Sequence, residues 1–493
     1  MKPWSVVAFA IPALLGSTPA QGAPPDLPRP PPTITEPLDD PPLFGDKDGL
    51  VFFRDPLDYI RLYPHATVSA DGHGFLAPQI GTLQKSVAGA DLGARFFLRE
   101  ARLSLGGEII QRFAFDVGLN LVANPAIDGA RADGTRTVVA LSDAWASTDQ
   151  GRGLLFTAGY YQMPFSIENR TAHGDLPMLE RNLAIRGFVV PGGQVLGASV
   201  SGVALKDVAR WDLGVFGAES WAPGDIERSM QYVGRVRVLP FAPEAHSPIR
   251  GLQIGMSARL GWRNPRDSHE DIPAINTNQG FALFKPTFEQ DGRTVHVVPD
   301  GAQWAIGPEF RLPVQSFVFT SEAYWVTRHT SETIEGRPRD VERLGSLEGW
   351  GWYVQLSCWI LQALKVIDGE PPSAGEYPHP EHLELANLPP KVGRYGIELA
   401  VIGAGVNGQY LGASRAGTRS DVAATNIEAY QIGGSINYWQ TSRFRASFSY
   451  NAFYVPRSGS DGNLLVVPSN IAPVADLGTH TIHEVGGRVS VMF

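Results

Sequence analysis

Alternation of apolar and polar side chains is the feature that most restricts how this chain can fold. It is clearest between Gln111 and Leu121, where Phe113, Phe115, Val117, Leu119 and Leu121 alternate with Arg112, Ala114, Asp116, Gly118 and Asn120. Successive side chains of a β-strand point to opposite faces, so a period of two predicts a strand. This strand has one apolar face and one polar face.

The same alternation recurs along the chain, in segments separated by turns and loops. It predicts sixteen strands, at residues 59–70, 95–106, 109–122, 137–148, 153–161, 195–205, 209–217, 229–238, 251–262, 303–312, 316–328, 348–360, 393–404, 426–439, 443–454 and 481–493. Residues 71–94, 162–194, 263–302 and 329–347 are predicted to be long loops.

The polar faces of these strands carry Gly, Ser, Gln, Asn and many Arg residues. Such faces suit a water-filled interior better than the packed core of a sandwich or propeller, and the apolar faces suit lipid. The chain also lacks a run of about 18 apolar residues, which a transmembrane helix requires. We therefore predict an all-β fold: a transmembrane antiparallel β-barrel of about 16 strands, formed by residues 55–493 and surrounded by outer-membrane lipid.

The N-terminal 54 residues differ from this pattern. Residues 1–20 combine Lys2, an apolar run from Val6 to Leu15 and small residues before Gln21, which is typical of a secretory signal peptide. Residues 21–54 are rich in proline and are predicted to be a disordered leader. Together these features predict export to the outer membrane of a bacterium with two membranes.

Composition restricts the partners that the chain can bind. A net charge of -9 argues against nucleic acid, which recruits basic surfaces. The basic residues are 34 Arg and only 7 Lys, so any anion binding must depend on guanidinium groups. The single cysteine, Cys358, excludes an intrachain disulfide and a cysteine-based zinc cluster.

One motif suggests a cofactor site. Gly403, Gly405 and Gly408 match the G-x-G-x-x-G pattern of dinucleotide-binding turns, but no helical pattern follows them, so we interpret the segment as a strand. Standard hydrolase and NTPase motifs are also missing. We predict no enzyme activity, no catalytic residue, no metal and no cofactor. An outer-membrane hydrolase with a Ser/His pair on barrel strands remains an alternative.

Arginines on the polar faces carry the functional prediction, because guanidinium groups in a narrow pore attract and hold oxyanions. The expected pore-lining, anion-binding residues are Arg112, Arg210, Arg235, Arg237, Arg259, Arg311, Arg443, Arg445 and Arg488. The alternative is that acidic residues on the same faces neutralise them in a structural lattice. Those acids are Asp116, Asp212, Glu309, Glu322, Glu398 and Glu484.

The stretch from residue 159 to 197 resembles the hallmark of the phosphate-selective porin O/P family. The matching residues are Gly159, Pro164, Phe165, Ser166, Glu168, Glu180, Arg181, Pro191, Gly192 and Gly197. The resemblance implies a homotrimeric porin of sixteen strands, in which the loop at residues 162–194 folds inward as a constriction. Its expected constriction residues are Gln162, Glu168, Arg170, Glu180 and Arg181. Gln162 stands where the family has a lysine.

These observations lead to one expectation and two alternatives. We expect a passive outer-membrane porin for small anions, with phosphate and polyphosphate as candidate solutes, whose arginine-lined pore is narrowed by the 162–194 loop. One alternative is a general, weakly selective porin. The other, from a different class, is the outer-membrane hydrolase.

Overall fold

The structure is a computed structural model that describes most of the chain after Pro42. The described residues are 43–47, 50–57, 59–76, 94–110, 112–122, 139–151, 153–186, 194–205, 208–217, 230–243, 247–263, 275–279, 282–284, 288–290, 293–334, 337–362, 396–414, 425–441, 443–456 and 481–492. The predicted signal peptide (1–20) and most of the predicted leader (21–54) lie outside them.

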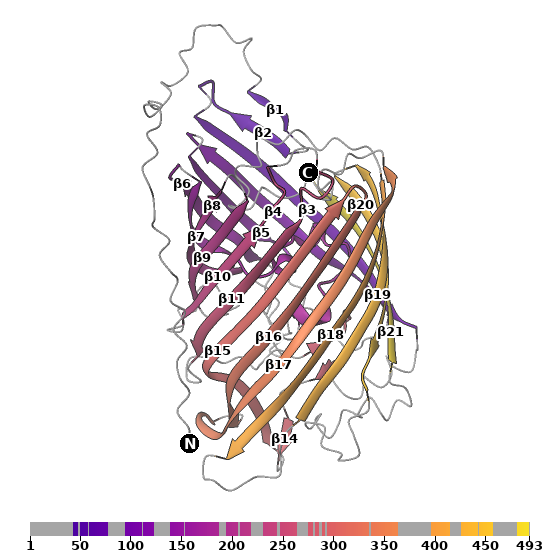
Figure 1. The fold of residues 1–493 in the computed structure, drawn as a ribbon. Coiled ribbons are helices and arrows are strands. Elements are labelled where there is room, and N and C mark those ends of the chain that lie inside the picture. Colours follow the sequence, from indigo (N-terminus) through magenta and orange to yellow (C-terminus); the bar gives the residue numbers. More distant parts are fainter. Residues whose placement is uncertain are drawn as a thin grey trace. The chain divides into compact units, whose positions relative to one another are not determined.

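The described residues form a closed antiparallel barrel (Figure 1). Its strands are β3 (Ile60–Phe75), β4 (Arg95–Ile109), β5 (Phe113–Asn120), β6 (Ala140–Asp149), β7 (Leu154–Gln162), β8 (Gln194–Ala204), β9 (Ala209–Gly217), β10 (Met230–Val238), β11 (Gln253–Arg263), β15 (Arg293–Val314), β16 (Phe317–Ile334), β17 (Arg337–Gln362), β18 (Gly396–Ser414), β19 (Thr425–Thr441), β20 (Phe444–Tyr454) and β21 (Thr481–Met492). Each strand pairs with the next in this order, and β21 closes the barrel by pairing with β3, from Glu484↔Phe75 to Met492↔Thr67. Nine strands from β3 to β11 and seven from β15 to β21 give the sixteen predicted.

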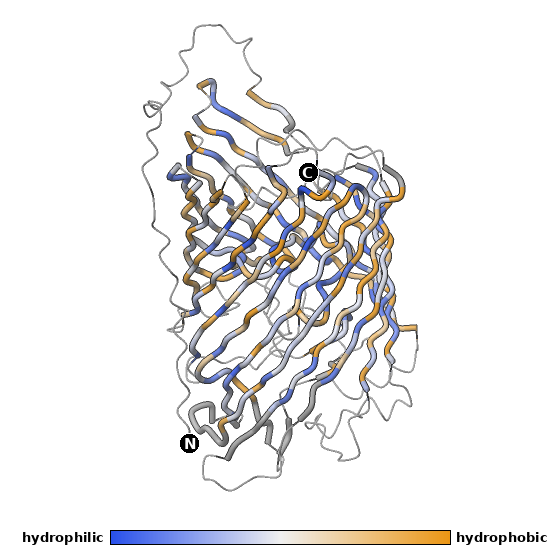
Figure 2. Tube along the Cα trace, viewed as in Figure 1, coloured by the Kyte–Doolittle hydropathy of each residue, from blue (hydrophilic) through white to orange (hydrophobic). Residues whose placement is uncertain are grey.

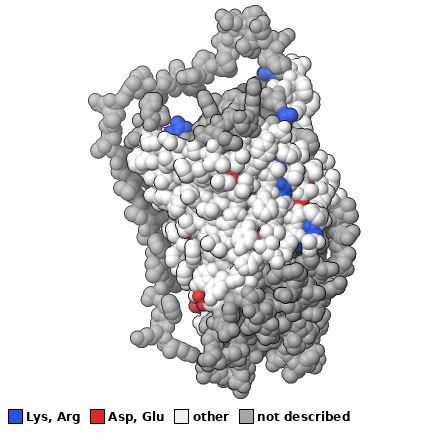
Figure 3. Space-filling model, turned by 90° about the vertical axis from the view of Figure 1, so that its right-hand side faces the viewer, with Lys and Arg blue, Asp and Glu red and all other residues white. Residues whose placement is uncertain are grey.

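The two faces of each strand meet different surroundings, as the alternation predicts. In β10, Val233, Arg235 and Arg237 are buried, whereas Tyr232 is 50% exposed and Val236 is 52% exposed. Figure 2 shows this alternation of hydropathy along the strands. One outer side, in Figure 3, shows few charged atoms among the described residues. The exposed apolar face is therefore the outside, and the polar face lines the interior.

No helix among the described residues has the length and apolar character needed to cross a membrane. The three glycines of the G-x-G-x-x-G motif all lie on β18, as their interpretation as a strand predicts. At Gly159 in β7, φ is +140°, and an added Cβ would lie 2.2 Å from the Ala144 carbonyl oxygen. Only glycine lets β6 and β7 approach so closely at this point.

Strands β15, β16 and β17 extend beyond their predicted ends. Residues 293–302, part of a predicted loop, belong to β15, and β16 and β17 continue through most of residues 329–347. The loop prediction was wrong here because Arg337, Arg339, Asp340 and neighbouring polar residues hide the period of two. In this extension residues 330–333 of β16 are buried at consecutive positions, so both faces of the sheet are covered and polar side chains pair without an apolar face.

A short hairpin precedes the barrel. It consists of β1 (Phe44–Lys47) and β2 (Leu50–Arg54), and β2 pairs with the start of β3 at Arg54↔Arg61. The rings of Phe44 and Phe53 lie 5.2 Å apart across the hairpin. The expectation of disorder up to residue 54 was thus wrong for its last residues, where an apolar run supplies strand pairing.

Smaller elements lie between the barrel strands. The connection after β7 contains α2 (Ile167–Arg170) and the 3-10 turn η1 (His173–Asp175). The connection between β11 and β15 contains β12 (Ile275–Asn276) and β13 (Ala282–Phe284), which pair with each other, and β14 (Phe288–Gln290), which pairs with β15.

Candidate functional site

Residues 163–186, which we call the inward segment, contact the polar faces of barrel strands. The Ser166 N–H donates to Ser257 Oγ on β11 at 3.1 Å, and the Leu183 N–H donates to Gln431 Oε1 on β19 at 2.9 Å. Asn437 Nδ2, also on β19, donates to the Pro177 carbonyl oxygen at 2.8 Å. Because these faces line the interior, the inward segment lies inside the barrel.

The first helix of the inward segment is capped twice. Ser166 Oγ accepts from the Asn169 N–H at 3.0 Å, which is the usual role of an N-cap serine. The Glu322 carboxylate on β16 accepts from the Ile167 N–H at 2.8 Å and the Glu168 N–H at 3.1 Å. Tyr353 on β17 holds this carboxylate through its hydroxyl, at 2.6 Å. A carboxylate at a helix N-terminus also stabilises the helix dipole.

Four of the five predicted constriction residues shape the inward segment itself. Glu168 Oε1 accepts from the Asn182 N–H at 2.6 Å, and its other oxygen accepts from Asn182 Nδ2. Arg181 donates to the carbonyl oxygens of Glu168 and Thr171, and Arg170 donates to that of Gln162. These contacts fold residues 162–182 into a compact turn.

Glu180, the fifth predicted residue, attaches the segment to the barrel wall. Its carboxylate lies 2.7 Å from Arg99 Nη1 on β4 and 3.0 Å from Arg488 Nη2 on β21. Arg488 also donates to both oxygens of Asp71 on β3, each at 2.8 Å, and to the Leu179 carbonyl oxygen. Asp71, Glu180 and Arg488 are buried, and Arg99 is half-buried. The network therefore fixes residues 179–180 against three strands.

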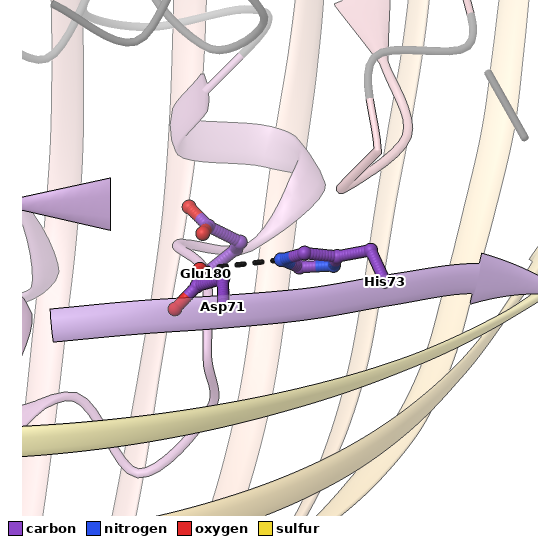
Figure 4. Close-up of side chains that lie close together, drawn as sticks. All are labelled: Asp71, His73 and Glu180. Atoms are coloured by element: carbon purple, nitrogen blue, oxygen red, sulfur yellow. Dashed lines mark hydrogen bonds and ion pairs between the residues drawn. The ribbon is translucent and has the colours of Figure 1, made fainter. Parts of the chain in front are cut away.

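Asp71, His73 and Glu180 are the group in the described residues that most resembles a metal site (Figure 4). Their ligand atoms lie within 4.8 Å of one another, and His73 Nε2 is 3.2 Å from Asp71 Oδ2. However, the Arg488 guanidinium already binds both Asp71 oxygens and one Glu180 oxygen. A cation would have to replace a guanidinium at the same oxygens, so these residues do not fit a metal.

The predicted pore-lining arginines occupy three kinds of place. Arg235 binds Glu309 at 3.0 Å, and Arg237 binds Asp212 at 3.0 Å, all on buried faces. Arg445 donates to the Gly174 and Leu176 carbonyl oxygens, and Arg259 is buried. The half-buried positions are Arg210, Arg311 and Arg443.

Arg112 does not face the interior. It lies exposed in the turn between β4 and β5, before β5 begins at Phe113. The alternating pattern assigned Arg112 to the interior face. That prediction was wrong because the pattern does not show at which residue the strand begins.

A second inward segment, residues 275–279, was missed by the sequence analysis. Gln279 Nε2 donates to the Gly74 carbonyl oxygen at 2.6 Å, and its own carbonyl oxygen accepts from Arg95 at 2.9 Å. Arg186, at the end of the first inward segment, donates to the Thr277 carbonyl oxygen and to Asn278 Oδ1. The short run INTNQ carries no periodic signal that separates it from an ordinary loop.

Docking of the inward segment is expected to weaken as the pH rises toward 8. Burial raises the pKa of Glu168 from 4.5 to about 8; the Asn182 N–H and the charges of Arg181 and Arg186 oppose the shift, and Glu322 adds to it. A higher pKa in the docked state means that docking favours the protonated acid. This contribution is complete below about pH 4.5 and is lost as the pH passes about 8.

Hydrogen exchange measures this effect. After correction for the intrinsic pH dependence, amides of residues 163–186 should exchange faster at roughly pH 9.5 than at roughly pH 6. Glu168→Gln should remove most of the difference, because glutamine does not ionise. Equal pH dependence in both proteins would contradict the assignment to Glu168.

Comparison with known proteins identifies a family for this chain. The family model described as phosphate-selective porin O and P matches residues 79–365, which is more than half of the chain. A comparison with curated proteins found no match.

Solved structures similar to this chain include outer-membrane proteins. OmpT of Vibrio cholerae is 8% identical (TM-score 0.47), with 88% of this chain and 98% of that chain covered. The outer membrane channel DcaP of Acinetobacter baumannii is 11% identical (TM-score 0.45; 90% and 99% covered), and an anion-selective porin from Comamonas acidovorans is 9% identical (TM-score 0.44; 88% and 100% covered). The match over residues 79–365 confirms the resemblance seen in residues 159–197: the chain belongs to the phosphate-selective porin O and P family and is an outer-membrane porin rather than an enzyme.

Proposed function

We propose that this porin passes small anions passively through an interior narrowed by the two inward segments. The observation that carries the proposal is how Arg445 is bound. Its guanidinium donates to Leu176 O at 2.6 Å, to Gly174 O and to Asn437 Oδ1 at 2.8 Å, all uncharged oxygens. A guanidinium held by neutral acceptors keeps its positive charge inside the barrel, which favours anions.

The hydrogen-bond acceptors of three other predicted arginines assign them a different role. Arg235, Arg237 and Arg488 are each bound to a carboxylate, so their charge is largely neutralised within the wall. They fit the structural lattice that we considered as an alternative. Anion preference, in this proposal, comes from the fewer arginines that bind carbonyl and amide oxygens.

Phosphate and polyphosphate are proposed solutes on the basis of the family and of the guanidinium groups. Guanidinium binds oxyanions in a bidentate manner, whereas lysine acts as a point charge. Lys47 is the single lysine among the described residues, and it lies in β1, outside the barrel strands. Any phosphate binding in the described part of the interior therefore depends on arginine.

We also propose that the barrel works as a homotrimer in outer-membrane lipid and that residues 1–20 direct its export. The exposed apolar faces of the strands support contact with lipid or with a second barrel. A signal peptide accords with an outer-membrane destination.

Planar-bilayer recording tests the anion preference directly. Across a KCl gradient, the reversal potential of the purified protein should shift toward that of chloride. A potential near zero would favour the general, weakly selective porin, and a shift toward potassium would overturn the proposal. Adding phosphate should reduce the chloride current if phosphate binds inside, and an unchanged current would remove phosphate from the list of bound solutes.

A further inference from the structure

The junction between the two inward segments contains a charged residue that the family resemblance does not indicate. Arg186 ends the described part of the first segment and donates to the Thr277 carbonyl oxygen at 3.0 Å and to Asn278 Oδ1 at 2.7 Å. Both acceptors belong to the second segment. The Arg186 guanidinium therefore joins two loops that lie 91 and 92 residues apart in the sequence.

The second segment is itself fixed to the barrel wall. The Gln279 N–H donates to Glu484 Oε1 at 3.3 Å, and Gln279 Nε2 donates to the carbonyl oxygens of Gly74 and Val485. Arg95 on β4 donates to the Gln279 carbonyl oxygen. Residues 277–279 are buried against β3, β4 and β21, so Thr277 and Asn278 offer Arg186 a fixed pair of acceptors.

The charge of Arg186 is not cancelled by a bound carboxylate. In the described part of the chain, both groups that accept hydrogen bonds from its guanidinium are uncharged. The carboxylates of Glu168, Glu180 and Glu484 act on it electrostatically, but each already accepts from another group. Arg186 thus differs from Arg235 and Arg488, whose partners are carboxylates.

Arg186 also contacts solvent where its neighbours do not. Residues 179–185 of the inward segment are all buried, at 4% exposure or less, whereas Arg186 is partly exposed. Its guanidinium lies inside the barrel at the junction of the two segments, where it donates to acceptors of the second segment. A fixed charge in the interior of a pore acts on the ions that pass.

We propose that Arg186 is a specificity-determining residue for small anions, and that Thr277 and Asn278 position it. This inference rests on the proposed anion-preferring pore and names the residue that supplies much of the preference. The planar guanidinium of Arg186 can donate to Thr277 and Asn278 at the same time. These contacts hold the two segments together and keep the charge at their junction.

The test compares three variants with the wild-type protein in planar bilayers. Arg186→Gln should lower the chloride-to-potassium permeability ratio by roughly fivefold, because it removes one fixed charge from the interior of the barrel. Arg186→Lys should keep the ratio within about twofold but increase current noise, because an ammonium cannot bind both oxygens as a fork. Arg112→Gln is the matched control, since it removes an arginine from an exposed turn and should change neither property.

The outcomes separate this inference from the proposed function. A wild-type protein without anion preference would overturn both. An anion-selective wild type with an unchanged ratio in Arg186→Gln would overturn the role of Arg186 alone. If Arg186→Gln fails to form channels, Asn278→Ala provides the second variant: it keeps the charge, removes one acceptor, and should increase current noise. Quiet currents identical to wild type would contradict the positioning role of Asn278.

Discussion

Replacing Arg488 with methionine is expected to lower the free energy of unfolding of the barrel by about 3–5 kcal/mol, the usual cost of removing one partner from a buried ion network. Arg488 neutralises Asp71 and Glu180, and all three side chains are buried. Methionine fills similar volume but leaves both carboxylates without their shared cation. Urea-induced unfolding of the protein in lipid vesicles, followed by tryptophan fluorescence, measures the change.

A second variant shows whether Arg488→Met lowers stability because two carboxylates lose their cation or because side-chain packing is lost. Arg488→Met combined with Asp71→Asn removes one of the two stranded charges, so it should recover part of the lost stability. Arg112→Met is the control at an exposed position and should stay within about 0.5 kcal/mol of wild type. Equal destabilisation of the single and double variants would show that packing, not charge, makes Arg488 important.

The barrel could be predicted from the sequence because lipid and water impose opposite requirements on alternate residues. In β10, the sequence YVGRVRV shows which side chains face outward before any pairing is known. Where β16 continues through residues 330–333, both faces of the sheet are buried and this requirement disappears. The polar run from Arg337 to Glu342 therefore looked like a loop, although it continues β17.

The partners of the charged residues could not be predicted in the same way. Parity places Arg488 on an interior face, but its partners Asp71 and Glu180 lie 417 and 308 residues away. The pairing depends on barrel closure and on the path of the inward segment, neither of which leaves a local pattern. Arg186 was missed for the same reason, because its acceptors belong to a loop with no periodic signal.

The arginines whose acceptors are described above thus divide into two groups by what accepts their hydrogen bonds. Those bound to carboxylates fix strands and the inward segment, and removing them should act mainly on stability. Those bound to neutral oxygens, such as Arg186 and Arg445, are the ones to which we attribute the proposed anion preference. The alternating pattern of the sequence treats both groups alike, so the number of interior arginines does not by itself predict anion preference.

Replacing Glu322 with alanine is expected to release the first helix of the inward segment and raise the unit conductance. Glu322 accepts from the Ile167 and Glu168 N–H groups and from the Tyr353 hydroxyl. Hydrogen bonds to a charged group contribute about 1.5–3 kcal/mol each, so docking of α2 should weaken by about 3 kcal/mol or more. That loss shifts the ratio of docked to released segment by roughly 100-fold. Single-channel recording should show flicker to a larger conductance level.

Glu348→Ala provides the matched control, because Glu348 lies exposed on β17 and contacts Ser346 rather than the inward segment. It should leave the unit conductance unchanged. Tyr353→Phe removes one of the three donors and should give an intermediate flicker rate, because the two backbone N–H groups still bind the carboxylate. A Glu322→Ala channel with wild-type conductance and no flicker would show that Ser257, Gln431 and Asn437 hold the segment without help. In that case the helix cap on β16 would serve the assembly of the barrel rather than the width of its pore.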